Sequence, residues 1–79
     1  MTTINKRSRL EENGVSVKKV RDGIIYCYCG SSRYATLKLT ETSGEEDCFT
    51  VTKEGLSGNE WGKDFTDFDE VIKFILDRQ

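Results

Sequence analysis

Residues 15–29, VSVKKVRDGIIYCYC, are the stretch that decides the fold. At their centre, Asp22 and Gly23 supply the positive φ angles that a tight β-hairpin turn requires. Short runs of apolar and β-branched residues lie on both sides of this turn and favour extended strands. The stretch therefore predicts an antiparallel hairpin whose strands cover residues 15–20 and 24–29.

The first strand of this hairpin breaks the regular alternation of a strand. Val15 and Val17 share one face, whereas Val20 falls on the opposite face. A β-bulge, or an early end of the strand, would reconcile the three positions.

Two further strands follow at the spacing of an antiparallel meander. Residues 33–40 alternate apolar and polar side chains, with Leu37 and Leu39 on the apolar side. Residues 48–53 repeat this alternation, with Phe49 on the inward side. Together with the hairpin, these segments predict a four-stranded antiparallel β-meander, with a three-stranded sheet as the alternative.

The segment after the fourth strand lacks periodicity. Residues 54–63 contain three glycines and one large side chain, Trp61. Such a composition is typical of a loop. We expect Trp61 either to cover the edge of the core or to be an exposed binding residue.

The C-terminal residues carry the pattern of an amphipathic helix. Thr66 or Asp67 has the spacing of an N-terminal cap, and the acidic residues that follow favour the positive end of the helix dipole. An apolar stripe recurs at helical spacing and predicts that this helix packs on one face of the sheet. The predicted core consists of Ile25, Cys27, Leu37, Leu39, Phe49, Val51, Phe68, Ile72, Ile75 and Leu76.

The N-terminal residues differ from the rest of the chain. Residues 1–13 are polar, with Ile4 and Leu10 as their larger apolar side chains after Met1. A segment this short forms a marginal helix at best on its own. We therefore predict a flexible or partly helical arm over 1–13, with at most one frayed helical turn around residues 8–13, and a single α+β domain over 14–79.

Composition disfavours catalysis. The chain has 79 residues, of which 35% are hydrophobic, and a domain this small has little interior in which to build a pocket. It contains no histidine, which removes the commonest general base and a common zinc ligand. No catalytic triad, phosphate-binding glycine loop or metal-ligand set is present. We expect a protein that is not an enzyme, uses no cofactor and has no evident small-molecule substrate.

Three features bear on the compartment. No apolar run approaches the roughly 20 residues that cross a bilayer, and no apolar segment of a secretory signal follows the N-terminal basic residues. The cysteines Cys27, Cys29 and Cys48 cannot all pair within one chain. We expect free thiols that pack as small apolar side chains, no metal site and a cytoplasmic location without membrane contact.

One face of the predicted sheet has no helix to cover it. Tyrosines and basic side chains project from that face, a combination that can stack bases and hold phosphates. The same residue types also serve cross-strand packing and protein contact. The candidate partner-binding residues are Lys18, Arg21, Tyr26, Tyr28, Arg33, Tyr34, Lys38 and Trp61.

The charge distribution is uneven. Residues 1–39 hold eight Lys/Arg and three Asp/Glu, whereas residues 40–79 hold four and eleven. Such asymmetry is typical of proteins with a polyanion-facing side. We expect a small binding module with a regulatory, adaptor or inhibitory role that docks on a protein partner or on a second copy of itself. Nucleic-acid binding through the Tyr/Lys/Arg face is the alternative.

Overall fold

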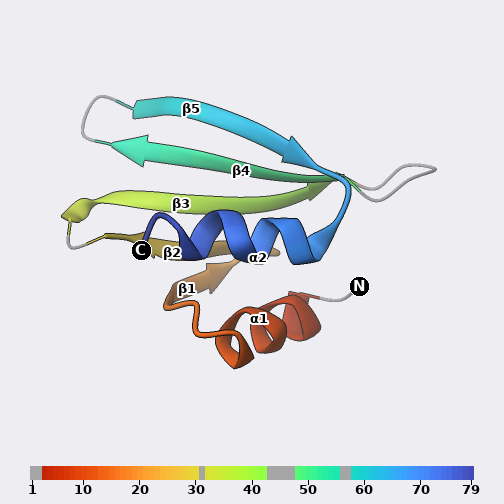
Figure 1. Ribbon diagram of the computed structural model, residues 1–79. Coiled ribbons are helices and arrows are strands. Elements are labelled where there is room, and N and C mark those ends of the chain that lie inside the picture. The colour runs from red at the N-terminus through yellow and green to blue at the C-terminus, as the bar shows by residue number, and fades with distance from the viewer. Residues whose placement is uncertain (1–2, 31, 43–47, 56–57) are drawn as a thin grey trace.

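The computed structural model describes residues 3–30, 32–42, 48–55 and 58–79, and leaves the side chains of residues 3, 32–34 and 42 outside the description (Figure 1). The elements in chain order are α1 (Thr3–Glu12), β1 (Val17–Arg21), β2 (Ile24–Cys29), β3 (Ser32–Thr42), β4 (Cys48–Gly55), β5 (Gly58–Phe65) and α2 (Phe68–Leu76).

The strands form one antiparallel sheet in the order β1-β2-β3-β4-β5, and α2 lies across one of its faces (Figure 1). The N-terminal helix, α1, packs beside β1 and β2. The predicted α+β fold with an antiparallel meander and a C-terminal helix is confirmed. The predicted strand number is wrong, because the described sheet has five strands.

The additional strand is β5, in the segment predicted to be a loop. It pairs with β4 from Phe49 opposite Phe65 to Lys53 opposite Trp61. Its glycines and charged side chains conceal an alternation in which the large aromatic residues point to the helix side. Pairing with β4 satisfies the backbone of this segment, and this tertiary contact outweighs the weak strand propensity of its residues.

The prediction for the N-terminal segment is also wrong. It forms the ten-residue helix α1 rather than a flexible arm with one frayed turn. Leu10 is fully buried, Lys6 forms a 2.6 Å ion pair with Glu41 of β3, and Arg9 pairs with Asp69 of α2. These contacts come from distant parts of the chain and stabilise a helix that would be marginal alone.

The predicted turn in the first hairpin is confirmed, and of the two explanations offered for the broken alternation, a bulge or an early end of the strand, the structure shows the bulge. Asp22 and Gly23 have φ angles of 53° and 77°. The register moves from Val17 opposite Cys27 to Lys19 opposite Tyr26, so Lys18 is the extra residue of a bulge. The bulge places two consecutive lysines, 18 and 19, on the sheet face away from the helices, because it reverses the alternation between them.

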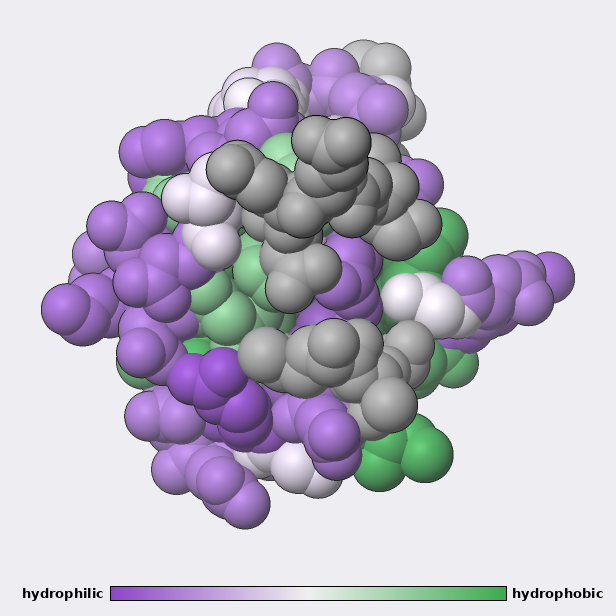
Figure 2. All heavy atoms as spheres, turned by 90° about the vertical axis from the view of Figure 1, so that its right-hand side faces the viewer, coloured by the Kyte–Doolittle hydropathy of each residue, from purple (hydrophilic) through white to green (hydrophobic). Residues whose placement is uncertain are grey.

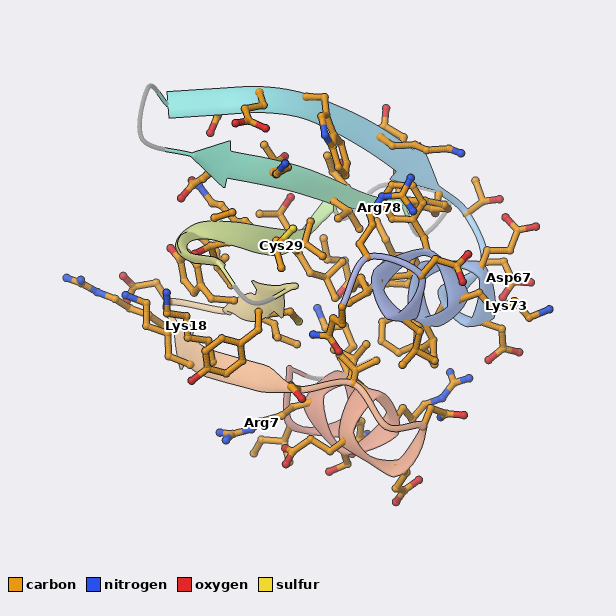
Figure 3. The ribbon with its side chains drawn as sticks, turned by 60° about the vertical axis from the view of Figure 1, so that its left-hand side comes forward. Arg7, Lys18, Cys29, Asp67, Lys73 and Arg78 are labelled. Atoms are coloured by element: carbon orange, nitrogen blue, oxygen red, sulfur yellow. The ribbon has the colours of Figure 1, made fainter. Side chains whose placement is uncertain are left out.

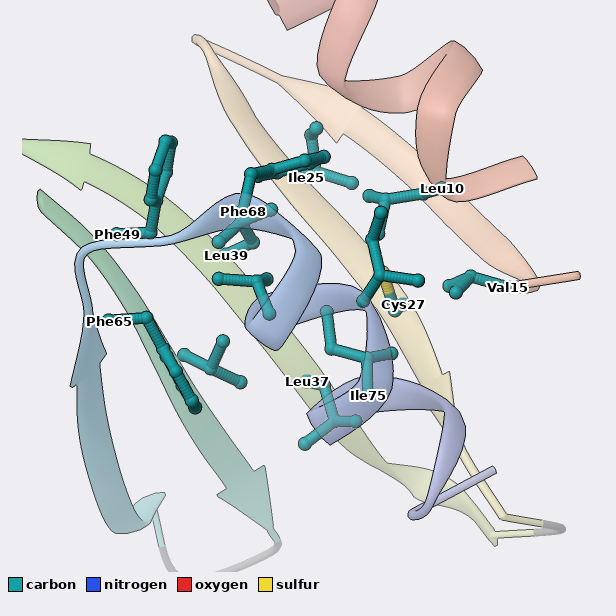
Figure 4. Packing of buried hydrophobic residues seen from close by; sticks show 13 residues of the cluster. Leu10, Val15, Ile25, Cys27, Leu37, Leu39, Phe49, Phe65, Phe68 and Ile75 are labelled. Carbon is teal, nitrogen blue, oxygen red and sulfur yellow. The ribbon is translucent and has the colours of Figure 1, made fainter. Parts of the chain in front are cut away.

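The core lies between the sheet and the two helices (Figure 4). Nine of the ten predicted core residues are buried, and Leu76 is only partly buried because it lies at the end of α2. Four residues join them that the prediction omitted: Leu10, Val15, Phe65 and Val71.

Both ends of α2 are fixed by specific hydrogen bonds. Asp67 is the N-cap, and its side chain accepts a 2.9 Å bond from the Asp69 backbone N–H. Beyond the last turn, the Gln79 amide exchanges two 2.9 Å bonds with the Ser16 backbone and donates a third, also 2.9 Å, to the Tyr28 carbonyl. In the described part of the chain, neither helix is long and apolar enough to cross a bilayer.

Candidate binding face

The sheet surface opposite the helices is the candidate site, and we call it the open face. One complete row of it crosses all five strands, in the order Lys19, Tyr26, Lys38, Thr52 and Gly62. Rows on either side add the described side chains of Lys18, Arg21, Ile24, Tyr28, Thr36, Thr40, Thr50, Glu54 and Asp64. Lys18 projects on the side of the sheet away from α2 (Figure 3).

Two lysine–tyrosine pairs occupy the β1–β2 half of the open face. The Lys19 Nζ lies 4.9 Å from the ring centroid of Tyr26, and the Lys18 Nζ lies 5.8 Å from that of Tyr28. Lys18 also donates a 3.4 Å hydrogen bond to the Thr36 hydroxyl, which helps to bury that threonine. Among the described residues, neither lysine forms an ion pair with a carboxylate. Their charges are therefore available to a partner.

The β4–β5 half of the same face is acidic. Glu54 lies 3.4 Å from the ammonium of Lys38, and Asp64 accepts a 2.7 Å hydrogen bond from the Thr50 hydroxyl. Threonine side chains separate the two halves, and Thr40 donates to the backbone of β4. The open face is thus bipolar: basic and aromatic along β1 and β2, acidic along β4 and β5.

The structure brings together five of the eight candidate residues: Lys18, Arg21, Tyr26, Tyr28 and Lys38. Arg21 is exposed, and its 3.7 Å contact with neighbouring Asp22 is solvated, so it contributes little restraint. The backbones of Arg33 and Tyr34 belong to β3, but their side chains lie outside the described residues.

Trp61 does not belong to the open face. It lies on the helix side of β5, where its ring meets Phe74 edge-on at a centroid separation of 5.4 Å. The Arg78 guanidinium lies 3.5 Å from the Phe74 centroid and 5.5 Å from that of Trp61. Trp61 is partly buried against the core, as in the expectation that it covers the core edge. It lies on the opposite side of the sheet from Tyr26 and Tyr28, so the candidate residues do not all share one surface.

Three charged members of the open face, Lys19, Glu54 and Asp64, were not among the candidate residues. Lys19 would point inward in an unbroken alternation, and only the bulge turns it outward. Asp64 lies in β5, most of which was predicted to be a loop, and Glu54 lies near the end of β4, where that predicted loop begins. A period-two pattern in the alternating aromatic residues of β5 was the available signal for the acidic half.

Other parts of the described surface show fewer features that could bind a partner. At the end of the molecule towards which β3 runs, hydrophilic side chains predominate where the described surface is visible (Figure 2). The described large hydrophobic side chains with the highest exposure are Ile4, at 78%, and Tyr28, at 44%. Tyr28 lies on the open face beside a lysine, whereas Ile4 lies on α1. No three His, Cys, Asp or Glu side chains in the described ranges are grouped as ligands for a metal ion.

The three thiols are free. Cys27 is fully buried beneath the helices, and burial raises the pKa of its thiol to about 12. Because its thiol stays protonated at neutral pH, Cys27 acts there as a small apolar core residue. Cys29 and Cys48 are partly buried.

On the helix side of β4, a hydrogen bond from Lys53 to Glu60 raises the pKa of Lys53.

The buried thiol predicts a loss of stability in alkali. Because the pKa of Cys27 is raised from 9.0 to about 12, its stabilising effect is complete below about pH 9 and is lost as pH rises towards 12. The loss is about 1.4 kcal/mol per pH unit in that window. Urea denaturation of the wild type and of Cys27→Ala at several pH values measures it. The variant is less stable at pH 7 but has a flatter slope above pH 9, and equal slopes would contradict the assignment.

Comparison with protein-family models, curated proteins and solved structures gave no match for this chain. Its function is therefore argued from the geometry and charge of the open face.

Proposed function

We propose that this protein is a non-catalytic binding module that docks its open face on a partner protein carrying charges of both signs. The observation that carries the proposal is the bipolar arrangement of that face. Among the described residues, Lys18 and Lys19 have no carboxylate partner at one edge, and Glu54 and Asp64 lie towards the other. Surfaces of proteins can match both signs at once, and such matching provides specificity.

The aromatic residues supply the apolar part of such an interface. Tyr28 is 44% exposed, and Tyr26 and then Ile24 follow it along β2 on the same face, both partly buried. Tyrosine is enriched at protein interfaces, because its ring buries area while its hydroxyl keeps a polar contact. The threonines between the two charged halves present methyl groups as well as hydroxyls. The centre of the face is therefore suited to contact with a protein surface.

Nucleic-acid binding is the second candidate. It is favoured by the two lysines that lie over tyrosine rings, because cations beside aromatic platforms are what single-stranded nucleic acids require. However, a phosphate backbone that crossed the whole sheet would meet Glu54 and Asp64. Like-charge contact at these positions is unfavourable. The arrangement therefore supports nucleic acid only along β1 and β2.

A double substitution, Tyr26→Ala with Tyr28→Ala, tests the proposal. We expect it to abolish partner binding and to cost no more than about 1 kcal/mol of stability per cross-strand pair. Tyr26→Phe with Tyr28→Phe is the matched control, because it keeps both rings. Proteins retained from an extract by immobilised wild type and control, but not by the alanine variant, would support the proposal. An identical set retained by all three proteins would contradict it.

A labelled single-stranded 20-mer distinguishes the second candidate. Fluorescence anisotropy is measured with wild type and the alanine variant at low and moderate salt. Binding that needs both tyrosines and weakens steeply with salt would replace the protein partner by nucleic acid. Under the protein-partner proposal, the 20-mer does not bind through the tyrosines.

A further inference from the structure

We infer that the partner on the open face is a second copy of this chain, related by a two-fold axis that runs along the strands. In this arrangement β1 of one copy faces β5 of the other, and β2 faces β4. The inference rests on the proposed function, since it names the occupant of the same face. It is carried by the order in which charges cross the sheet.

The order of charges is complementary to itself under this rotation. Arg21 lies on β1 in the row of Ile24, and Asp64 lies on β5 in the row of Thr50 and Thr40. Rotation about an axis along the strands reverses the order of strands but keeps each row in place. It therefore brings Arg21 of each copy opposite Asp64 of the other. An isologous interface makes every such contact twice.

The neighbouring rows fit the same rotation. Tyr28 on β2 faces Glu54 on β4 of the other copy, and the ammonium of Lys18 lies 5.8 Å from the centroid of that tyrosine ring. Lys19 belongs to the row that ends at Gly62 on β5. Gly62 presents no side chain there, so the long lysine has room above it.

At the centre of the interface, the positive charges of the two copies of Lys38 are offset by nearby carboxylates. Lys38 lies on β3 and therefore meets its own counterpart near the axis. Each Lys38 lies 3.4 Å from Glu54 of its own chain. The rotation places the second Glu54 on the other side of the axis, above β2. The two ammonium groups are thus flanked by two carboxylates, which offsets their repulsion.

The other face-to-face rotation is excluded by charge. An axis in the interface plane but perpendicular to the strands would place β1 over β1. Lys18, Lys19 and Arg21 would then oppose one another, which is unfavourable. In the aligned class of sheet packing, the strands of the two sheets stay within about 30° of each other, which keeps the strand order described above.

The size of the face predicts a weak dimer. Five strands about 4.8 Å apart and three rows of side chains span about 24 by 20 Å, which is about 500 Å² for each copy. This is below the area of a standard interface and is typical of transient association. We expect a dissociation constant on the order of 10–100 µM.

Charge reversal provides the decisive experiment. We expect wild type to dimerise in sedimentation equilibrium between about 10 µM and 1 mM. Arg21→Glu and Asp64→Arg should each weaken dimerisation at least about tenfold, because each leaves two like-charged pairs. A mixture of the two variants should associate again, since every 21–64 pair between unlike copies then carries opposite charges. Lys73→Glu, an exposed charge reversal on α2, is the control and should dimerise as wild type does.

Two outcomes would overturn the inference. One is a wild type that stays monomeric up to about 1 mM. The other is association that persists in both single variants, or that the mixture fails to restore when labelled Arg21→Glu is titrated with Asp64→Arg and observed by amide shifts. The wild type could instead be monomeric and retain a foreign protein that the Tyr26→Ala, Tyr28→Ala variant does not retain. In that case the second-copy inference fails and the proposed function stands.

Discussion

Replacing Leu10 with alanine is expected to lower the free energy of unfolding by about 2–5 kcal/mol, as for other fully buried leucines. Leu10 is the residue of α1 whose side chain is completely enclosed, and it lies in the same cluster as Ile25 and Cys27. Truncation removes buried apolar area and leaves a cavity between α1 and the sheet. A loss of this size is a large share of the stability of a small domain. Urea denaturation followed by circular dichroism measures it.

Ile4 provides the matched control on the same helix. Its side chain is 78% exposed, so Ile4→Ala should change the free energy of unfolding by no more than about 0.5 kcal/mol. Both substitutions improve helix propensity by similar small amounts, so the difference between them reports docking of α1. Equal effects would mean that α1 does not pack on the sheet in solution.

The docking of α1 could not be predicted from its own sequence. Its residues form no continuous apolar stripe, and its anchors are single side chains whose partners are far along the chain. Lys6 pairs with a residue 35 positions away and Arg9 with one 60 positions away. Local propensity carries no information about such pairs. By contrast, α2 carries its own cap and stripe; a cap at Thr66 or Asp67 was predicted, and Asp67 is the N-cap.

The sheet shows the same distinction. Strands β3 and β4 alternate apolar and polar residues, and β2 alternates Ile25 and Cys27 with tyrosines; the buried positions of these strands were predicted correctly. Strand β5 is an edge strand with few apolar residues. It forms a strand because its backbone pairs with β4, a contact that its own sequence does not reveal. The placement of Tyr26 and Tyr28 on the open face was predicted from the alternation of side chains along β2. The bipolar character of the face did not, because it depends on the bulge at Lys18 and on the placement of Asp64 opposite Thr50.

Removing the carboxylate of Glu41 is expected to have the other large effect on stability. The side chain of Lys6 is only 4% exposed and that of Glu41 is 19% exposed, and their 2.6 Å ion pair joins α1 to β3. In the described part of the chain, Lys6 forms no other ion pair. Glu41→Ala leaves the ammonium enclosed without a partner, which costs about 3–5 kcal/mol in buried pairs. The loss is measured by urea denaturation at neutral pH.

Substitution of the lysine should behave differently, because a buried ion pair costs desolvation on both sides. Lys6→Met removes the ammonium and keeps the length of the side chain against the core, while Glu41 retains partial access to water. Its effect should be smaller than that of Glu41→Ala by about 2 kcal/mol or more. Lys6→Met combined with Glu41→Leu should be near neutral or stabilising. If Glu41→Ala proves as mild as Lys6→Met, Lys6 reaches water once its partner is gone, and the pair then fixes the position of α1 without contributing much stability.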